Sequence, residues 1–463
     1  AVLSNDRYAS YVDNYAKLPL LLVVYPTVPN YHKDMGALAC LAQVLGQGKN
    51  SVLYQQMIKK KTALQASTFS SLSELAGEFF VQLIPSPGKS LAALDSIYRN
   101  SLDSFEARGV TDDDIAKFKG GIESQLINGL QSVSGKISQL ASFQTFTGNP
   151  NKIADLIKMY QSVTKEDVIR VYNEYIKGKG AVFLSVLPKG QEKLIAAADN
   201  YNIDSSKYDA PDYGYAGLKY AKAKDNFDRS KIPGNGANPT VKVPKFWRKD
   251  MPNGVKMIGT ESNEIPTVTI TITVPGGHLL QANDTSKIGL ASMFASMMNE
   301  DTRNYTAEQM AVELQKLGSN VSVSSKFDGI TFSIQALKKN LDQTLALVEE
   351  RMFNPKFTAE AFGRIQQQRL QGFKQAKADP ASVADNVFAK LNYGPNSILG
   401  MSEDGTEYTI ANLKLEDVES YYKNYMTSKG VKVVIVGDVK QAEVIPKLAF
   451  LNKLPNKKVE LPA

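Results

Sequence analysis

The pattern of apolar and polar positions predicts the same group of elements near the end of each half of the chain. The first copy has apolar positions at Val168, Tyr172 and Tyr175, then Gly180, then an apolar run over residues 181–186. The same pattern recurs 250 residues later, at Val418, Tyr422, Tyr425, Gly430 and residues 431–436. The spacing of four and then three keeps one face of a helix apolar, and glycine suits the left-handed residue that ends a helix. Self-similarity at this long offset predicts a duplicated domain.

The first half is predicted to begin with a strand over residues 18–24. Because Pro19 and Pro26 bound this strand and proline cannot donate to a ladder, we expect it at or near a sheet edge. The sequence then predicts helices and an antiparallel pair of strands. The predicted helices cover residues 34–45, 52–61, 91–107, 111–130, 134–146 and 153–160, and the strands cover 64–70 and 77–84.

The second half repeats this order. A strand over residues 267–274 alternates apolar and polar positions, and Asp328 with Gly329 forms a favoured hairpin turn between strands 321–327 and 330–337. The remaining predicted elements are a strand at 255–260 and helices at 288–298, 310–317, 341–353, 358–375 and 380–391.

Residues 188–253 interrupt the repeat. They are rich in Asp, Lys, Tyr, Gly and Pro, which predicts an extended linker lying along the surface. Its tyrosines could anchor the linker or stack on nucleic-acid bases. Anchoring is favoured because few cations lie between them. These tyrosines are Tyr201, Tyr208, Tyr213, Tyr215 and Tyr220. The predicted division is therefore a domain over 1–187, a linker over 188–253 and a domain over 254–463.

Composition narrows the class of protein. The chain has 463 residues, of which 43% are hydrophobic and 22% charged, as in a globular protein with a sizeable core. No apolar stretch approaches the ~18 residues of a membrane span. The net charge of +7 is spread over 54 basic and 47 acidic residues, which does not favour nucleic-acid binding. The chain starts with Ala and shows no signal segment, so we expect a processed product or part of a longer protein. Its compartment stays open, with the bacterial periplasm as first choice.

Several phrases, in this order, resemble the insulinase/pitrilysin family of zinc metallopeptidases and their processing-peptidase relatives. In the first half, residues 34–54 are similar to the helix, glycine turn and Leu-Tyr helix of that family's second domain. In the second half, phrases at residues 267–277, 289–297, 353–355 and 434–438 are similar to the first-domain type. The resemblance implies an α+β fold with two homologous domains, each a mainly antiparallel sheet with helices packed on one face.

In active members of the family, a His-x-x-Glu-His helix binds zinc together with a downstream glutamate. The matching positions in this chain are Ser292, Ala295 and Ser296. The downstream helix over residues 361–374 has no Asp or Glu, and carries Gln366, Gln367, Gln368 and Gln371 in the region of the third ligand. Neutral hydroxyls and amides do not supply the ligand charge that zinc needs. We therefore expect no catalytic residue, no metal site and no cofactor in this chain.

The counts of His and Cys lead to the same expectation without the family. His32 and His278 are the only histidines, and Cys40 is the only cysteine, which also excludes an internal disulfide. Cys40 lies on an apolar helix face and is expected in the core. His32 is expected to cap or flank the helix that follows it. His278 could contact a partner. We favour the alternative, in which it is an ordinary loop residue at the end of a strand.

The resemblance also implies an Arg and a Tyr in the second domain that position substrate. The matching positions are Ile58 and Gln65, so that role is not carried over. Lys59 or Lys60 could replace the Arg with a shift in position, but a surface lysine is favoured.

Two functions follow from these observations. The first is a non-catalytic portion of an insulinase-type peptidase, inactive alone, that shapes the chamber and binds a peptide or unfolded polypeptide at a strand edge. Zinc would then reside in a domain upstream of Ala1. The alternative is a structural or assembly subunit that pairs with a separate zinc-bearing chain or another protein.

Overall fold

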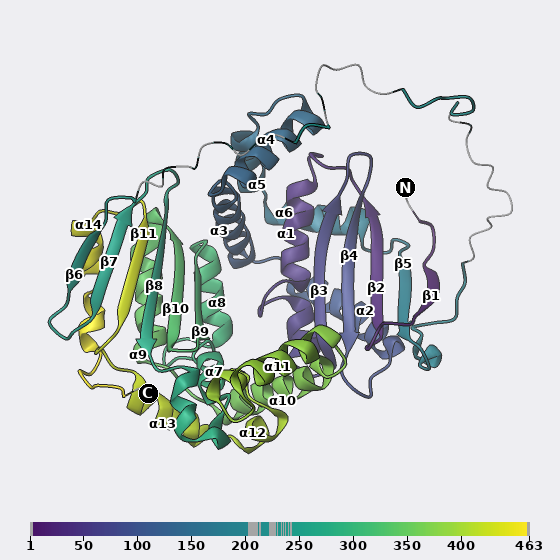
Figure 1. The fold of residues 1–463 in the computed structure, drawn as a ribbon. Coiled ribbons are helices and arrows are strands. Elements are labelled where there is room, and N and C mark those ends of the chain that lie inside the picture. The colour runs from purple at the N-terminus through teal and green to yellow at the C-terminus, as the bar shows by residue number, and fades with distance from the viewer. Residues whose placement is uncertain are drawn as a thin grey trace.

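The computed structural model describes residues 3–201 and 243–460, together with residues 212, 214–221, 228, 230–232, 234, 236, 238 and 240 between them. These residues form two sheets, each accompanied by helices (Figure 1). The first half contains β1 (Arg7–Asp13), β2 (Leu20–Thr27), α1 (Met35–Gly46), η1 (Tyr54–Ile58), β3 (Ala63–Leu72), β4 (Gly77–Pro85), α2 (Leu91–Arg108), α3 (Asp112–Gly129), α4 (Val133–Thr147), α5 (Ile153–Gln161), α6 (Lys165–Tyr175), β5 (Val182–Pro188) and η2 (Glu192–Leu194).

The second half contains a similar series. It comprises β6 (Trp247–Asp250), β7 (Lys256–Glu261), β8 (Thr267–Pro275), η4 (His278–Asn283), η5 (Thr285–Lys287), α7 (Leu290–Met297), α8 (Ala307–Lys316), β9 (Asn320–Ser325), β10 (Gly329–Leu337), η6 (Lys338–Asn340), α9 (Leu341–Phe353), α10 (Ala359–Ala376), α11 (Pro380–Tyr393), η7 (Ile398–Gly400), α12 (Glu407–Asn412), α13 (Leu415–Tyr425), β11 (Lys432–Gly437), α14 (Gln441–Lys447) and η8 (Ala449–Lys453). None of the helices among the described residues is long and apolar enough to cross a membrane.

The two sheets share one arrangement of strands. Their orders are β1-β5-β2-β4-β3 and β6-β7-β11-β8-β10-β9. In each sheet the closing strand of the half, β5 or β11, pairs antiparallel with β2 or β8 and parallel with β1 or β7. The remaining pairs are antiparallel. This confirms the α+β fold class with a mainly antiparallel sheet in each half, as the repeat at 250 residues indicated.

Three features of the sheets differ from the expectations. The strand β2 is central rather than an edge strand. Pro26 is tolerated there because it pairs with Glu78 of β4 beyond Val24, where the pairing with β5 ends. The edge strand β1 is not apparent in the sequence pattern, and β6 lies within the predicted linker yet pairs with β7. Among the linker tyrosines, the ring of Tyr201 stacks under Arg7, whereas Tyr208 and Tyr213 lie outside the described residues.

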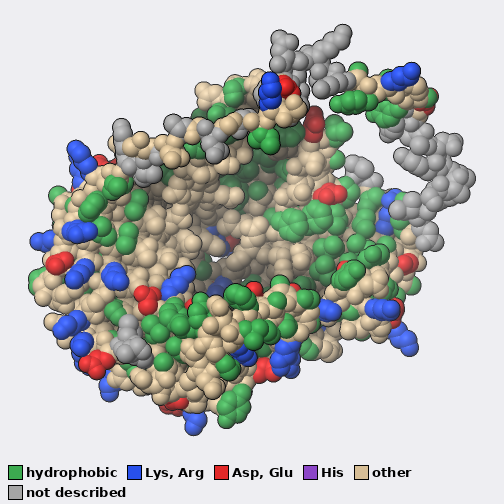
Figure 2. Space-filling model, in the orientation of Figure 1, with side chains coloured by type: hydrophobic (Ala, Val, Ile, Leu, Met, Phe, Trp, Pro, Cys, Tyr) green, Lys and Arg blue, Asp and Glu red, His purple; other side chains and the backbone are tan. Residues whose placement is uncertain are grey.

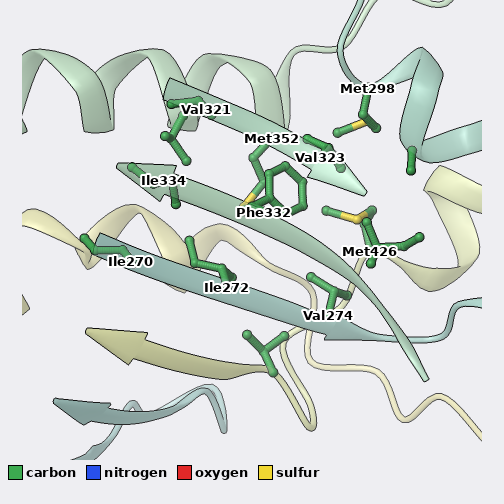
Figure 3. Close-up of a cluster of buried hydrophobic side chains, with 14 of the residues drawn as sticks. Ile270, Ile272, Val274, Met298, Val321, Val323, Phe332, Ile334, Met352 and Met426 are labelled. Carbon is green, nitrogen blue, oxygen red and sulfur yellow. The ribbon is translucent and has the colours of Figure 1, made fainter. Parts of the chain in front are cut away.

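Each half has its own hydrophobic core. In the second half, the inward side chains of β8 alternate as predicted, and Ile270 and Ile272 are completely buried. They pair with Ile334 and Phe332 of β10. Figure 3 shows these side chains on the same side of the sheet as Met352 of α9. The predicted apolar alternation therefore forms the layer between sheet and helices.

The two halves meet at α3 and α8, which lie side by side between the sheets (Figure 1). A Cβ atom at Gly120 of α3 would lie 2.3 Å from the carbonyl oxygen of Lys316 in α8, so only glycine permits this approach. Ion pairs Lys316–Asp113 and Lys339–Glu123, at 2.8 and 2.7 Å, flank the contact. The interface thus fixes how α10 of the second half lies against the first half.

Candidate functional site

The helix α7 places Ser292 and Ser296 one turn apart, facing α10. Arg369 of α10 donates from Nη2 to Ser292 Oγ, Ser296 Oγ and the carbonyl oxygen of Ser292, each at 2.9 Å. Ser292 Oγ also donates to Asp404 Oδ1 at 2.7 Å, and Asp404 lies 3.3 Å from Arg369 Nη1. Ala295, the third predicted position, is 2% exposed and belongs to the core. A guanidinium therefore bonds to the two serines that match the predicted ligand positions.

Both serine hydroxyls of the site are hydrogen-bonded to charged side chains. Burial lowers the pKa of Arg369, and the nearby charge of Asp404 opposes this shift only in part. Its side chain is 17% exposed, whereas that of Asp404 is 67% exposed. A guanidinium is a donor only, so it occupies the oxygen atoms of both serines and repels a second cation.

These residues do not fit a zinc ion, since zinc in proteins is held by Cys, His and carboxylate ligands. Across residues 3–201 and 243–460 and the described positions between them, no group of three or more His, Cys, Asp or Glu is placed to hold a metal.

Of the glutamines expected near the third ligand position, Gln368 lines a cavity together with Ser296 and Arg369, whereas Gln366, Gln367 and Gln371 lie elsewhere. Gln366 donates to the carbonyl oxygens of Ile410 and Leu413. Gln367, Gln368 and Gln371 line a groove of about 440 Å³ between α10 and the first half. Arg369, in the middle of this run, was missed because its contacts lie 73 and 77 residues away in sequence. The only signal in the sequence was the spacing of four between the two serines.

The edge of β9 beside the site is closed by side chains. Asn299 donates from Nδ2 to the carbonyl oxygen of Val323 at 2.8 Å and accepts from its N–H at 3.0 Å. Arg351 Nη1 donates to the carbonyl oxygen of Val321. Burial lowers the pKa of Arg351 to about 10. Because an amide side chain imitates a paired strand at Val323, a peptide could join this edge only by displacing Asn299.

A cavity of about 920 Å³ lies between the halves. Figure 2 shows the molecule hollowed between the two halves. In the wall of the cavity, Glu300 of the second half forms ion pairs with Lys49 of the first half at 3.2 Å and with Arg364 of α10 at 2.6 Å. These charged residues were not singled out from the sequence, because each is unremarkable until the halves are brought together. The cavity combines ionic and apolar lining.

The candidate ligands Cys40, His32 and His278 do not line this site. Cys40 is fully buried, as expected for the core, and burial raises its pKa to about 12. His32 Nδ1 accepts from the backbone N–H of Asp34, so it flanks the start of α1 as expected. His278 is 1% exposed and its Nε2 bonds to the carbonyl oxygen of Ile398, so burial excludes the partner contact considered for it.

The positions that match the substrate-positioning Arg and Tyr fall near the groove against α10. Ile58 lines this groove, and Gln65 lies on β3. Lys59 forms an ion pair with Glu308 of the second half at 3.1 Å, and Lys60 donates to Gln56. Lys59 therefore helps to join the halves.

Comparison with protein families gives two matches in succession. The family described as the Peptidase M16 inactive domain matches residues 3–121, and the family described as Insulinase (Peptidase family M16) matches residues 257–395. The chain belongs to peptidase family M16. Within this M16 chain, the insulinase match covers α7, Arg369 and the serines.

Individual relatives cover about half of the M16 chain or less. A protein of Helicobacter pylori named non-peptidase homolog YmxG is 26% identical over 205 residues, covering 44% of this chain and 47% of that protein. A probable mitochondrial-processing peptidase subunit beta of Arabidopsis thaliana is 23% identical, covering 46% of this chain and 40% of that protein. The chain thus spans less than half the length of these curated relatives.

Two solved structures are similar to parts or all of the chain. A peptidase M16 inactive domain from Pseudomonas fluorescens has a TM-score of 0.43 and 22% identity, covering 47% of this chain and 54% of that chain. The periplasmic protease PqqL of Escherichia coli has a TM-score of 0.40 and 16% identity, covering 100% of this chain and 52% of that chain.

Proposed function

We propose that this M16 chain is non-catalytic and binds a peptide or unfolded polypeptide in the hollow between its halves. The zinc would then belong to a domain outside these residues or to a partner chain. The observation that carries the proposal is the position of Arg369, which bonds to both serines at the positions that match the His-x-x-Glu-His motif. A fixed guanidinium can neither activate a water as a bound metal does nor act as a general base.

The relatives support this proposal by their names. One is named a non-peptidase homolog, and one matched family is described as an inactive domain. Others are named zinc proteases, including PqqE of Helicobacter pylori. Both kinds of chain therefore occur among relatives of similar sequence, and the serines and arginine favour the non-peptidase kind for this chain.

The test is metal analysis of the chain after zinc exposure and dialysis, run beside a peptide-cleavage assay. We expect no stoichiometric zinc and no cleavage, because the site offers hydroxyls and a cation. The variant Arg369→Met is the matched control, since removing the cation leaves two hydroxyls and a single carboxylate, Asp404, which should not create zinc binding. Stoichiometric zinc with cleavage by the unchanged chain would refute the proposal.

A second candidate function is an assembly subunit that pairs with a separate zinc-bearing chain. It is favoured by relatives named as alpha and beta subunits of mitochondrial-processing peptidase. Peptide titration separates the two functions: the first requires the chain alone to bind peptide, whereas the second requires only association with a partner chain in light scattering.

A further inference from the structure

The groove between the two halves has an apolar floor and a basic rim. It lies between α10 and the segment of the first half from η1 to β3, and has a volume of about 440 Å³. Its apolar lining includes Ile58, Leu64 and Leu370, and its cations are Lys61, Arg364 and Lys374. None of the described residues that line it is Asp or Glu. This composition distinguishes it from the larger cavity, in which carboxylates accompany the cations.

Two of the three cations have no carboxylate partner among the residues that the structure describes. Arg364 is bound by Glu300, whereas Lys61 and Lys374 take part in no ion pair within the described part of the chain. Like charges concentrated in a cleft with low-dielectric walls raise the local concentration of an oppositely charged group. The groove is therefore electrostatically complementary to a carboxylate.

The backbone at Lys61 gives an independent reason to assign its side chain a role. Lys61 has φ of 58°, a left-handed conformation that non-glycine residues rarely adopt. It follows η1, where its N–H donates to the carbonyl oxygen of Ile58 and the N–H of Thr62 donates to that of Met57. Glycine would be favoured at such a helix end. Strained residues of this kind cluster at functional sites, because the strain persists only where something else retains the residue.

We propose that this groove binds an acidic peptide segment, with a carboxylate side chain at Lys61 and Lys374 and an apolar side chain on Leu64 and Leu370. The inference rests on the proposed peptide-binding function and adds the class of peptide. Both lysines are exposed at the rim, so their contribution is expected to fall as salt is raised.

The test is fluorescence anisotropy of the full chain with a labelled peptide that contains glutamate and leucine. A second peptide has glutamine in place of every glutamate. We expect the acidic peptide to bind about ten-fold more tightly than the neutral one, because two exposed ion pairs of ordinary strength give this ratio. Lys61→Gly and Lys374→Gln should each weaken the acidic peptide about three-fold and leave the neutral peptide unchanged. Lys423→Gln, an exposed helical lysine outside the groove, is the control.

Lys61→Gly also separates binding from folding. Glycine relieves the left-handed strain, so the variant should unfold at a Tm about 2 °C higher while binding more weakly. A loss of binding in a more stable protein cannot come from misfolding. Equal binding of both peptides, or unchanged binding by both variants, would overturn the inference and leave the proposed function standing. No binding of either peptide would overturn both.

Discussion

Replacing Arg369 by methionine tests whether the guanidinium holds α7 and α10 together. Methionine keeps an unbranched apolar stem and removes every N–H donor, so the three bonds of 2.9 Å to Ser292 and Ser296 are lost. Ser292 Oγ keeps its bond to Asp404, so Ser296 Oγ is the hydroxyl left without its partner.

The expected loss follows from these contacts. Ser296 is half-buried and lines the cavity between the halves, so the loss of its partner costs about 1 kcal/mol, the net contribution of an ordinary hydrogen bond. The ion pair with Asp404 adds little, since that carboxylate is 67% exposed. Removing the guanidinium also removes the cost of burying its charge, and this effect stabilises the variant. We expect the free energy of unfolding of the second half to fall by about 1 kcal/mol.

The only tryptophan gives a local assay. Trp247 packs against the core of the second half, so its fluorescence in urea reports the unfolding of that half. Arg303→Met, at an exposed arginine, is the control and should change stability by less than about 0.5 kcal/mol.

A double-mutant cycle isolates the bond to Ser296. Ser296→Ala should lose stability in the unchanged chain but be nearly neutral once Arg369 is methionine, because both partners are then apolar. A neutral or stabilising effect of Arg369→Met alone would refute the reasoning, and would mean that the guanidinium is retained at a cost to stability.

Three further predictions concern other parts of the structure. Asn299→Ala frees both backbone groups of Val323, so we expect a loss of about 2 kcal/mol and faster hydrogen exchange at the Val323 amide, whereas unchanged exchange would contradict the closed edge. Burial raises the pKa of Asp114, but hydrogen bonds from Arg108, Thr111 and Lys117 outweigh it and lower the value from 3.8 to about 2. Its stabilisation of about 2 kcal/mol is thus present above about pH 4 and lost as pH falls towards 2, so the stability difference between the unchanged chain and Asp114→Asn should shrink over this window. Glu300→Gln weakens the ionic link between the halves, and we expect a lower calorimetric Tm, with Glu74→Gln, an exposed acid between β3 and β4, as the unaffected control.

The sequence by itself determined the elements whose causes are local. The capping boxes at Thr111 with Asp114 and at Thr306 with Gln309 join residues three apart, and the helices α3 and α8 begin at Asp112 and Ala307, one and three residues from their predicted starts. The alternation in β8 likewise fixed which face is buried. With two histidines and one cysteine, the sequence also limited which metal sites were conceivable.

Only the tertiary structure decided which distant residues meet. The pattern of β2 is that of a strand, but its central place depends on β4 and β5, which lie far along the chain. Arg369 reaches the serines and Asn299 closes β9 through contacts between separate elements. Such contacts depend on how helices and sheets pack, and hydrophobic burial specifies which faces pack without specifying which polar side chains then come into reach. The repeat therefore followed from periodicity, while the site required the packed fold.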